Sequence, residues 1–141
     1  MAEKYREIDH TADAGLRIYG TNLKELFIHA AEGMFSIIGS GDFPSGEPRV
    51  TENIRIDSAD RELLLKDWLS ELLYLHSANH CLFNHFTIES MTDTSLKATI
   101  AGFTIQFSDE DGIQDVKAVT YHGLKVTQDA NGFEAQVIFD I

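Results

Sequence analysis

Apolar residues recur with a helical period in two segments and with a strand period in most of the remaining chain. The first helical stripe covers residues 23–38, and it follows Asn22, a good N-cap, with Glu25 in the capping-box position. Gly39 is expected to end this helix. The second stripe covers residues 64–75 and follows a short acidic cap. Each stripe predicts an amphipathic helix that a sheet must cover.

Alternating apolar and polar residues, the pattern of half-buried strands, fill most of the rest of the chain. Asn131-Gly132 is a strong hairpin signal before the last strand, and Gly102 is expected to separate two strands. The expected strands cover residues 5–8, 16–19, 50–56, 86–88, 96–100, 103–107, 116–121, 124–126 and 133–141. We predict an α+β fold, a single domain over residues 1–141 in which about two helices pack on one many-stranded mixed or antiparallel sheet.

Acidic residues outnumber basic ones by 23 to 11, and the formal net charge is −12. Affinity for nucleic acids comes mostly from Lys and Arg, so strong direct binding is not expected unless a local basic patch overrides the overall field. A cation or a basic protein surface is a more natural partner.

The expected location is the cytoplasm. No apolar run reaches the length of a membrane span, and the first residues lack the apolar segment of a secretory signal. Cys81 is the single cysteine, which excludes an internal disulfide and agrees with a reducing compartment.

A polar cluster of Asp9, His10 and Asp13 lies between the first two expected strands. A strand junction can hold oxygen ligands or acid–base groups at the rim of a sheet without burying charge. Asp and Thr also form turns in which the side chain bonds its own backbone. From these residues alone the turn is the better supported interpretation.

The C-terminus places the Asp140 side chain within one residue of the terminal carboxylate of Ile141. If the last strand ends near Asp13, three carboxyl groups converge and require a cation, because close like charges destabilise one another. Oxygen ligands select Ca²⁺, Mg²⁺ or Mn²⁺ over zinc. The alternative is a strand that simply ends there, with Asp140 facing solvent.

Other candidates have weaker support. His76, His80, Cys81 and His85 could supply four zinc ligands, but they span an expected helix end and lack an established zinc spacing. Glu71 is expected to be a solvated or sheet-edge acid, and His29 to lie on the flank of the first helix. No phosphate-binding glycine loop or serine-hydrolase elbow is present.

A basic residue and a histidine occur together in the expected strand 116–121 and just after it. Lys117 could offset the carboxylates or reach a partner, although an ordinary edge lysine is as well supported by the sequence. His122 follows at the end of the same segment.

Several motifs together resemble the archease family from end to end. The matching segments are Asp9-His10-Thr11-Ala12-Asp13, Leu23-x-Glu25-Leu26-Phe27-x-x-Ala30, Trp68-Leu69-x-Glu71-Leu72-Leu73, Val116-Lys117-Ala118-Val119-Thr120-Tyr121-His122 and the terminal Asp140-Ile141. The resemblance reverses the preference for a simple turn at Asp9–Asp13, and it favours the cation site over a last strand that simply ends at Asp140.

The resemblance implies a non-catalytic, cytosolic activator of the RNA ligase that joins tRNA halves with a 3′-phosphate or 2′,3′-cyclic phosphate to a 5′-hydroxyl. It implies that the activator promotes guanylylation of the ligase and multiple turnover. It also implies a divalent-metal site, most often calcium, at Asp13, Asp140 and Ile141. Lys117 matches a family lysine implicated in activation, and we group Asp9, His10 and His122 with it as partner-activation residues.

One segment departs from the family pattern as we interpret it. Residues 108–112 are acidic where many archeases carry a Lys-His pair, which puts in doubt any role of this loop toward RNA or an acidic partner. Two other functions remain open. One is an autonomous metal-dependent phosphohydrolase with His10 or His122 as general base; the other is a chaperone of tRNA-modification enzymes.

Overall fold

Two helices and eight strands form the part of the chain that the computed structural model describes, residues 3–10, 13–39, 47–105 and 115–141. The helices are α1 (Leu23–Ile38) and α2 (Arg61–Asn79). The strands are β1 (Tyr5–His10), β2 (Asp13–Gly20), β3 (Val50–Asp57), β4 (Cys81–Met91), β5 (Ser95–Thr104), β6 (Ala118–Val119), β7 (Lys125–Asp129) and β8 (Gly132–Asp140). Neither of these helices has a stretch long and apolar enough to cross a membrane. The predicted α+β class with two helices is confirmed.

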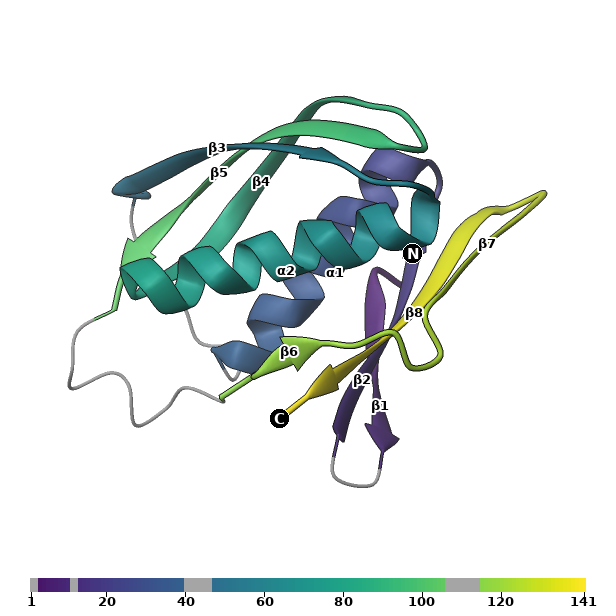
Figure 1. Cartoon of the computed structure of the whole chain (residues 1–141), viewed down its shortest axis with the longest axis horizontal. Coiled ribbons are helices and arrows are strands. Elements are labelled where there is room, and N and C mark those ends of the chain that lie inside the picture. The colour runs from purple at the N-terminus through teal and green to yellow at the C-terminus, as the bar shows by residue number, and fades with distance from the viewer. Residues whose placement is uncertain (1–2, 11–12, 40–46, 106–114) are drawn as a thin grey trace.

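The strands form two antiparallel sheets, where the sequence led us to expect one. Sheet A has the order β1-β2-β8-β6, with β7 also paired to β8, and sheet B has the order β3-β5-β4. Both helices lie between the sheets (Figure 1). One helix layer thus covers the apolar faces of both sheets. Alternation along a strand shows that one face is buried, but it does not show which sheet the strand joins.

The core is built on both sides of α1. Toward sheet B, the ring of Phe35 lies 5.8 Å from that of Phe83 and 5.9 Å from that of Phe86, both on β4. Toward sheet A, Leu16 and Ile18 of β2 are fully buried. Their side chains mark the inner face of sheet A, and the residues that alternate with them on β2 belong to its outer face. The outer face carries the site described below.

Both helix starts follow the sequence prediction. The Asn22 side chain accepts a hydrogen bond from the Glu25 backbone N–H at 2.9 Å, and the Asp60 side chain accepts from the Leu63 N–H at 2.8 Å. The Glu25 carboxylate accepts from the N–H and the hydroxyl of Thr21. These bonds satisfy donors that a helix start leaves without partners. The Glu25 side chain thus binds Thr21, the residue before the N-cap, and this differs from a standard capping box, in which it would bind the N-cap residue.

Gly102 lies inside a strand, and the expected break between two strands there is wrong. The segment predicted at 96–100 and the start of the segment predicted at 103–107 belong to one strand, β5, which ends at Thr104. A Cβ at position 102 would lie 2.0 Å from the Leu82 carbonyl oxygen of β4. Glycine is needed here for the close approach of two backbones.

Candidate metal-binding site

Asp13 and Asp140 lie directly opposite each other, one on β2 and one on β8, at one end of sheet A. Residues opposed in this way share a face, with Cβ atoms about 4.5–5.5 Å apart. Two acidic residues from opposite ends of the chain are therefore neighbours. The condition we set for convergence, that the last strand ends beside Asp13, is met.

Both side chains belong to the outer face of sheet A. Successive side chains of a strand point to opposite faces, and Leu16 and Ile18 occupy the inner face of β2, so Asp13 projects outward. On β8, Phe139 is fully buried and the next residue, Asp140, is exposed. The two carboxylates share a solvent-facing corner of the sheet, where a charged ligand could reach them.

The last residue is held at this corner by its own side chain. Ile141 is partly buried and packs against the hydrophobic core, which keeps the terminal carboxylate next to Asp140. The Asp140 carbonyl oxygen accepts a hydrogen bond from the Lys117 backbone N–H at 2.7 Å. The end of the chain is therefore anchored by one apolar contact and one backbone bond, and it does not extend into bulk water.

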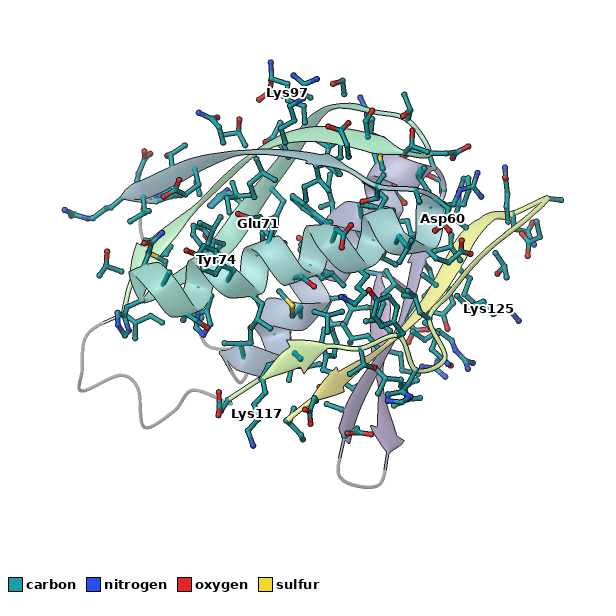
Figure 2. The ribbon with its side chains drawn as sticks, viewed as in Figure 1. Asp60, Glu71, Tyr74, Lys97, Lys117 and Lys125 are labelled. Carbon is teal, nitrogen blue, oxygen red and sulfur yellow. The ribbon has the colours of Figure 1, made fainter. Side chains whose placement is uncertain are left out.

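Lys117 flanks the acidic pair through the neighbouring strand. Ala118 of β6 is the register partner of Asp140, and Lys117 precedes it with an exposed side chain. Figure 2 shows Lys117 at the end of sheet A where the chain terminates. Of the proposed partner-activation residues with described side chains, Lys117 is the one whose backbone lies next to that of Asp140.

His122 lies in a turn beside β8, farther from Asp140 than Lys117 does. Its side chain is exposed, and its backbone N–H donates to Thr120 Oγ1. The next residue, Gly123, accepts a hydrogen bond from Gln136 Nε2 on β8, four residues before Asp140. The turn that carries His122 therefore lies beside the middle of β8, away from the strand's end.

The pairing of β1 with β2 places Asp9 and His10 next to the site. His10 is the partner of Asp13 and Asp9 is the partner of Ala14 across β1 and β2. Their side chains lie outside the described part of the structure, as does the acidic segment 108–112. The backbone places His10 on the strand next to the carboxylate pair.

The donor chemistry fits a hard divalent cation. Asp13, Asp140 and the terminal carboxylate offer oxygen atoms alone, and opposed like charges favour a bound cation between them. Within the described residues, no three His, Cys, Asp or Glu side chains are grouped in a way that could hold a metal ion. We expect the third carboxylate of such a site to be that of Ile141, which lies next to Asp140 in the chain.

The histidines and cysteine at the end of α2 do not form a zinc site. His76 Nδ1 lies 2.7 Å from the Cys81 carbonyl oxygen, and Cys81 Sγ donates to the Asn79 carbonyl oxygen. Burial raises the pKa of the Cys81 thiol and lowers the pKa of His76. Among the described residues, these side chains are not grouped in a way that could hold a metal ion. Glu71, also on α2, lines a hollow against β3 and so lies beside sheet B.

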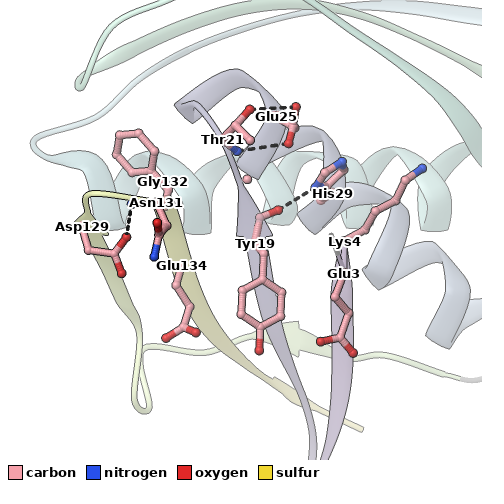
Figure 3. Close-up of a pocket in the computed structure, with 12 residues that line it drawn as sticks. Glu3, Lys4, Tyr19, Thr21, Glu25, His29, Asp129, Asn131, Gly132 and Glu134 are labelled. Atoms are coloured by element: carbon pink, nitrogen blue, oxygen red, sulfur yellow. Dashed lines mark hydrogen bonds between the residues drawn. The ribbon is translucent and has the colours of Figure 1, made fainter. Parts of the chain in front are cut away.

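A cavity that the sequence did not predict lies at the other end of sheet A. It has a volume of about 430 Å³ and is lined by residues from β2, β8, the hairpin between β7 and β8, and α1 (Figure 3). His29 stands in its wall, with Nδ1 2.6 Å from the Tyr19 carbonyl oxygen. The prediction that His29 lies on the flank of the first helix agrees with this position. The register from Asp13↔Asp140 to Gly20↔Phe133 separates this cavity from the carboxylate pair by the length of β2.

Residues 5–141 match the Archease protein family (MTH1598/TM1083). The archease of Methanosarcina acetivorans is 38% identical over all of this chain and 98% of its own length. The archease of Methanothermobacter thermautotrophicus is 36% identical over 94% of this chain and 95% of its own length.

Two solved structures share the fold. The solution structure of Methanobacterium thermoautotrophicum protein 1598 has a TM-score of 0.80 at 35% identity, covering 97% of this chain and 98% of its own. The crystal structure of an archease from Thermotoga maritima, described as a possible chaperone, has a TM-score of 0.69 at 20% identity and covers both chains fully. At that identity the second likeness concerns the fold alone.

Proposed function

The chain belongs to the archease family, and from this premise we propose that it activates an RNA ligase in tRNA splicing. The ligase would join 3′-phosphate or 2′,3′-cyclic-phosphate ends to a 5′-hydroxyl. The activator would promote guanylylation of the ligase and multiple turnover. The observation that carries the proposal is the direct opposition of Asp13 and Asp140 beside an anchored C-terminus.

In this proposal Asp13, Asp140 and the terminal carboxylate of Ile141 hold one divalent cation, most often Ca²⁺, with Mg²⁺ or Mn²⁺ as alternatives. A bound cation would supply positive charge that can attract phosphate or carboxylate oxygens of a partner. The chain's own groups fix the geometry. The β2–β8 register sets the two side chains opposite each other, and the Lys117 N–H holds the Asp140 backbone.

Lys117 would act toward the partner. Its side chain is exposed and its backbone bonds that of Asp140, so a phosphate or a carboxylate of the ligase complex could meet it near the site. The charge of −12 would favour docking on the basic surface with which a ligase handles RNA. Both features support a helper that completes or reshapes the active site of another protein.

The test is multiple-turnover ligation with purified ligase, with and without each variant of this protein. Asp13→Ala, Asp140→Ala and deletion of Ile141 are each expected to leave the fold intact and to abolish activation. Asp57→Ala is the matched control, because Asp57 is an exposed aspartate at the end of a strand in sheet B. Wild-type activation by all three variants would contradict the proposal.

A second assay separates activator from enzyme. The proposal predicts that the isolated protein, given Ca²⁺, Mg²⁺ or Mn²⁺ and no ligase, hydrolyses neither phosphoesters nor nucleotides. Hydrolysis that Asp13→Ala abolishes would instead identify a metal-dependent phosphohydrolase at the same carboxylates.

A further inference from the structure

A row of basic side chains crosses the outer face of sheet A, in a protein whose net charge is strongly negative. The register Arg6↔Arg17, Arg17↔Gln136 and Gln136↔Lys125 aligns one residue from each of four adjacent strands. The inner residues next to this row, Ile18, Ala135 and Val126, are buried, which places the row on the outer face. Arg6, Arg17 and Lys125 are exposed. Figure 2 shows Lys125 projecting from β7.

The centre of this row is hollowed. A cavity of about 220 Å³ is lined by Arg17, Lys125, Thr127 and Gln136, together with Glu134 and Ala135. Arg17 and Lys125 stand on either side of β8, two strand spacings or about 10 Å apart along the sheet. Within the described residues neither takes part in an ion pair, whereas Arg6 is held by Glu3 at 3.0 Å. Two cations therefore face a shallow hollow, with a hydroxyl, an amide and the Glu134 carboxylate beside them.

An aromatic ring lies one row beyond the cations. Tyr19 follows Arg17 by two residues on β2, so both project from the same face, and the Tyr19 side chain is half-buried. Figure 3 shows Tyr19 between Glu3, which precedes β1, and Glu134 of β8. These two carboxylates would repel phosphates from the Tyr19 row. Glu134 also borders the hollow, so a phosphate on this face would lie between Arg17 and Lys125 on the side away from Glu134, with Tyr19 available to a base.

We propose that this outer face of sheet A binds single-stranded RNA, with a phosphate between Arg17 and Lys125 and a base against Tyr19. Basic side chains that track a backbone, next to an aromatic ring on an open sheet, form the usual arrangement of single-strand binding surfaces. The choice of RNA over another polyanion rests on the proposed function. The row shares its face with the carboxylate pair, because Arg17 follows Asp13 by four residues, about 14 Å along β2.

RNA bound at this face would be held against the overall negative charge of the protein. An overall charge of −12 repels polyanions, so binding here is local, weak and dependent on salt. The protein would then contact the end of the RNA that the ligase holds, and it would not capture RNA from solution by itself. The acidic remainder of the surface would keep the RNA on this one face.

The test uses the protein alone and a fluorescent single-stranded RNA of ten nucleotides with a 3′-phosphate, followed by anisotropy at low salt. We expect Arg17→Glu with Lys125→Glu to weaken binding at least tenfold. The milder pair Arg17→Gln with Lys125→Gln should reduce the slope of log affinity against log salt by about 0.7, the value for one neutralised phosphate. Tyr19→Leu should weaken binding about fivefold or more.

The matched control is Arg55→Glu with Lys97→Glu. Arg55 and Lys97 are exposed cross-strand partners on sheet B, so the control changes net charge by the same amount on another face. We expect affinity within twofold of the wild type. Equal losses for both charge reversals, or no binding by the wild type, would overturn the inference. So would binding of an acidic peptide in place of RNA.

The two proposals fail separately. Ligase activation by the Arg17/Lys125 variants at wild-type levels, together with no RNA binding by the wild type, would remove the RNA surface and leave the activator. RNA binding that depends on Arg17 and Lys125, together with no ligase activation, would leave the surface and remove the activator.

Discussion

Trp68 Nε1 of α2 donates a hydrogen bond to the Phe27 carbonyl oxygen of α1 at 2.9 Å, and Trp68 is fully buried. This bond joins the two helices between the sheets. A buried indole N–H without a partner would destabilise the fold, so the carbonyl of Phe27 fixes where α2 can lie on α1.

We predict that Trp68→Phe lowers the free energy of unfolding by about 2–3 kcal/mol. The variant loses one buried hydrogen bond, leaves the Phe27 carbonyl with fewer partners and creates a cavity beside Phe86. Urea unfolding followed by circular dichroism measures the change. Tyr74→Phe on the same helix is the control, because Tyr74 is 63% exposed and its change should stay within about 0.5 kcal/mol. Equal effects of the two substitutions would show that the bond does not hold the helices.

Gly102→Ala is predicted to be more damaging than Gly33→Ala. At position 102 a Cβ meets backbone atoms of Leu82 and Phe83 at 2.0 and 2.6 Å, so β4 and β5 must separate. At position 33 the Cβ meets side chains of Leu16 and Tyr5 at 2.9 and 3.0 Å, which can shift, and alanine favours the helix by about 1 kcal/mol.

Thermal unfolding compares the two glycine variants. Gly102→Ala should lower the midpoint by at least 10 °C or prevent folding, which corresponds to a loss of about 3 kcal/mol or more. A larger drop for Gly33→Ala would contradict the close approach of β4 and β5.

His76 should make stability depend on pH below neutrality. Burial is the main cause that lowers its pKa, and His80 adds to the shift, while the bond to the Cys81 carbonyl and the charge of Asp115 oppose it. With the folded pKa below the unfolded value of about 6.5, the unfolded chain binds more protons. Stability is therefore retained above pH 6.5 and lost as the pH falls through the folded pKa.

Urea unfolding at several pH values between 5 and 7.5 measures this dependence. His76→Gln should flatten the loss of stability on acidification, and His122→Gln, which removes an exposed histidine, should not. The same slope for wild type and His76→Gln would show that His76 titrates alike in both states.

Local features of the fold could be predicted from the sequence. The Asn22 and Asp60 caps depend on bonds within three residues, so residue type and spacing suffice to place them. The helical stripes and most strands follow from periodicity for the same reason. Gly102 shows the limit of a local interpretation: the sequence marks a special backbone position, but the close approach to Leu82 depends on a distant strand.

The candidate site depends on contacts between distant segments. Asp13 and Asp140 could be named from the family resemblance, but their opposition follows from the register of β2 and β8, which no local pattern contains. The alignment of Arg17 with Lys125 through Gln136 depends on two registers, and the sequence analysis did not find it. The division into two sheets was missed for the same reason.

The claim on which the account depends is that Asp13, Asp140 and the terminal carboxylate share one divalent cation. Calorimetric titration of the isolated protein with Ca²⁺, repeated with Mg²⁺ and Mn²⁺, tests it most directly. We predict one site in the wild type, a loss of affinity of at least tenfold in Asp140→Asn and in the Ile141 deletion, and wild-type affinity in Asp57→Asn. Equal cation binding by all four proteins, or no binding by the wild type, would contradict the account.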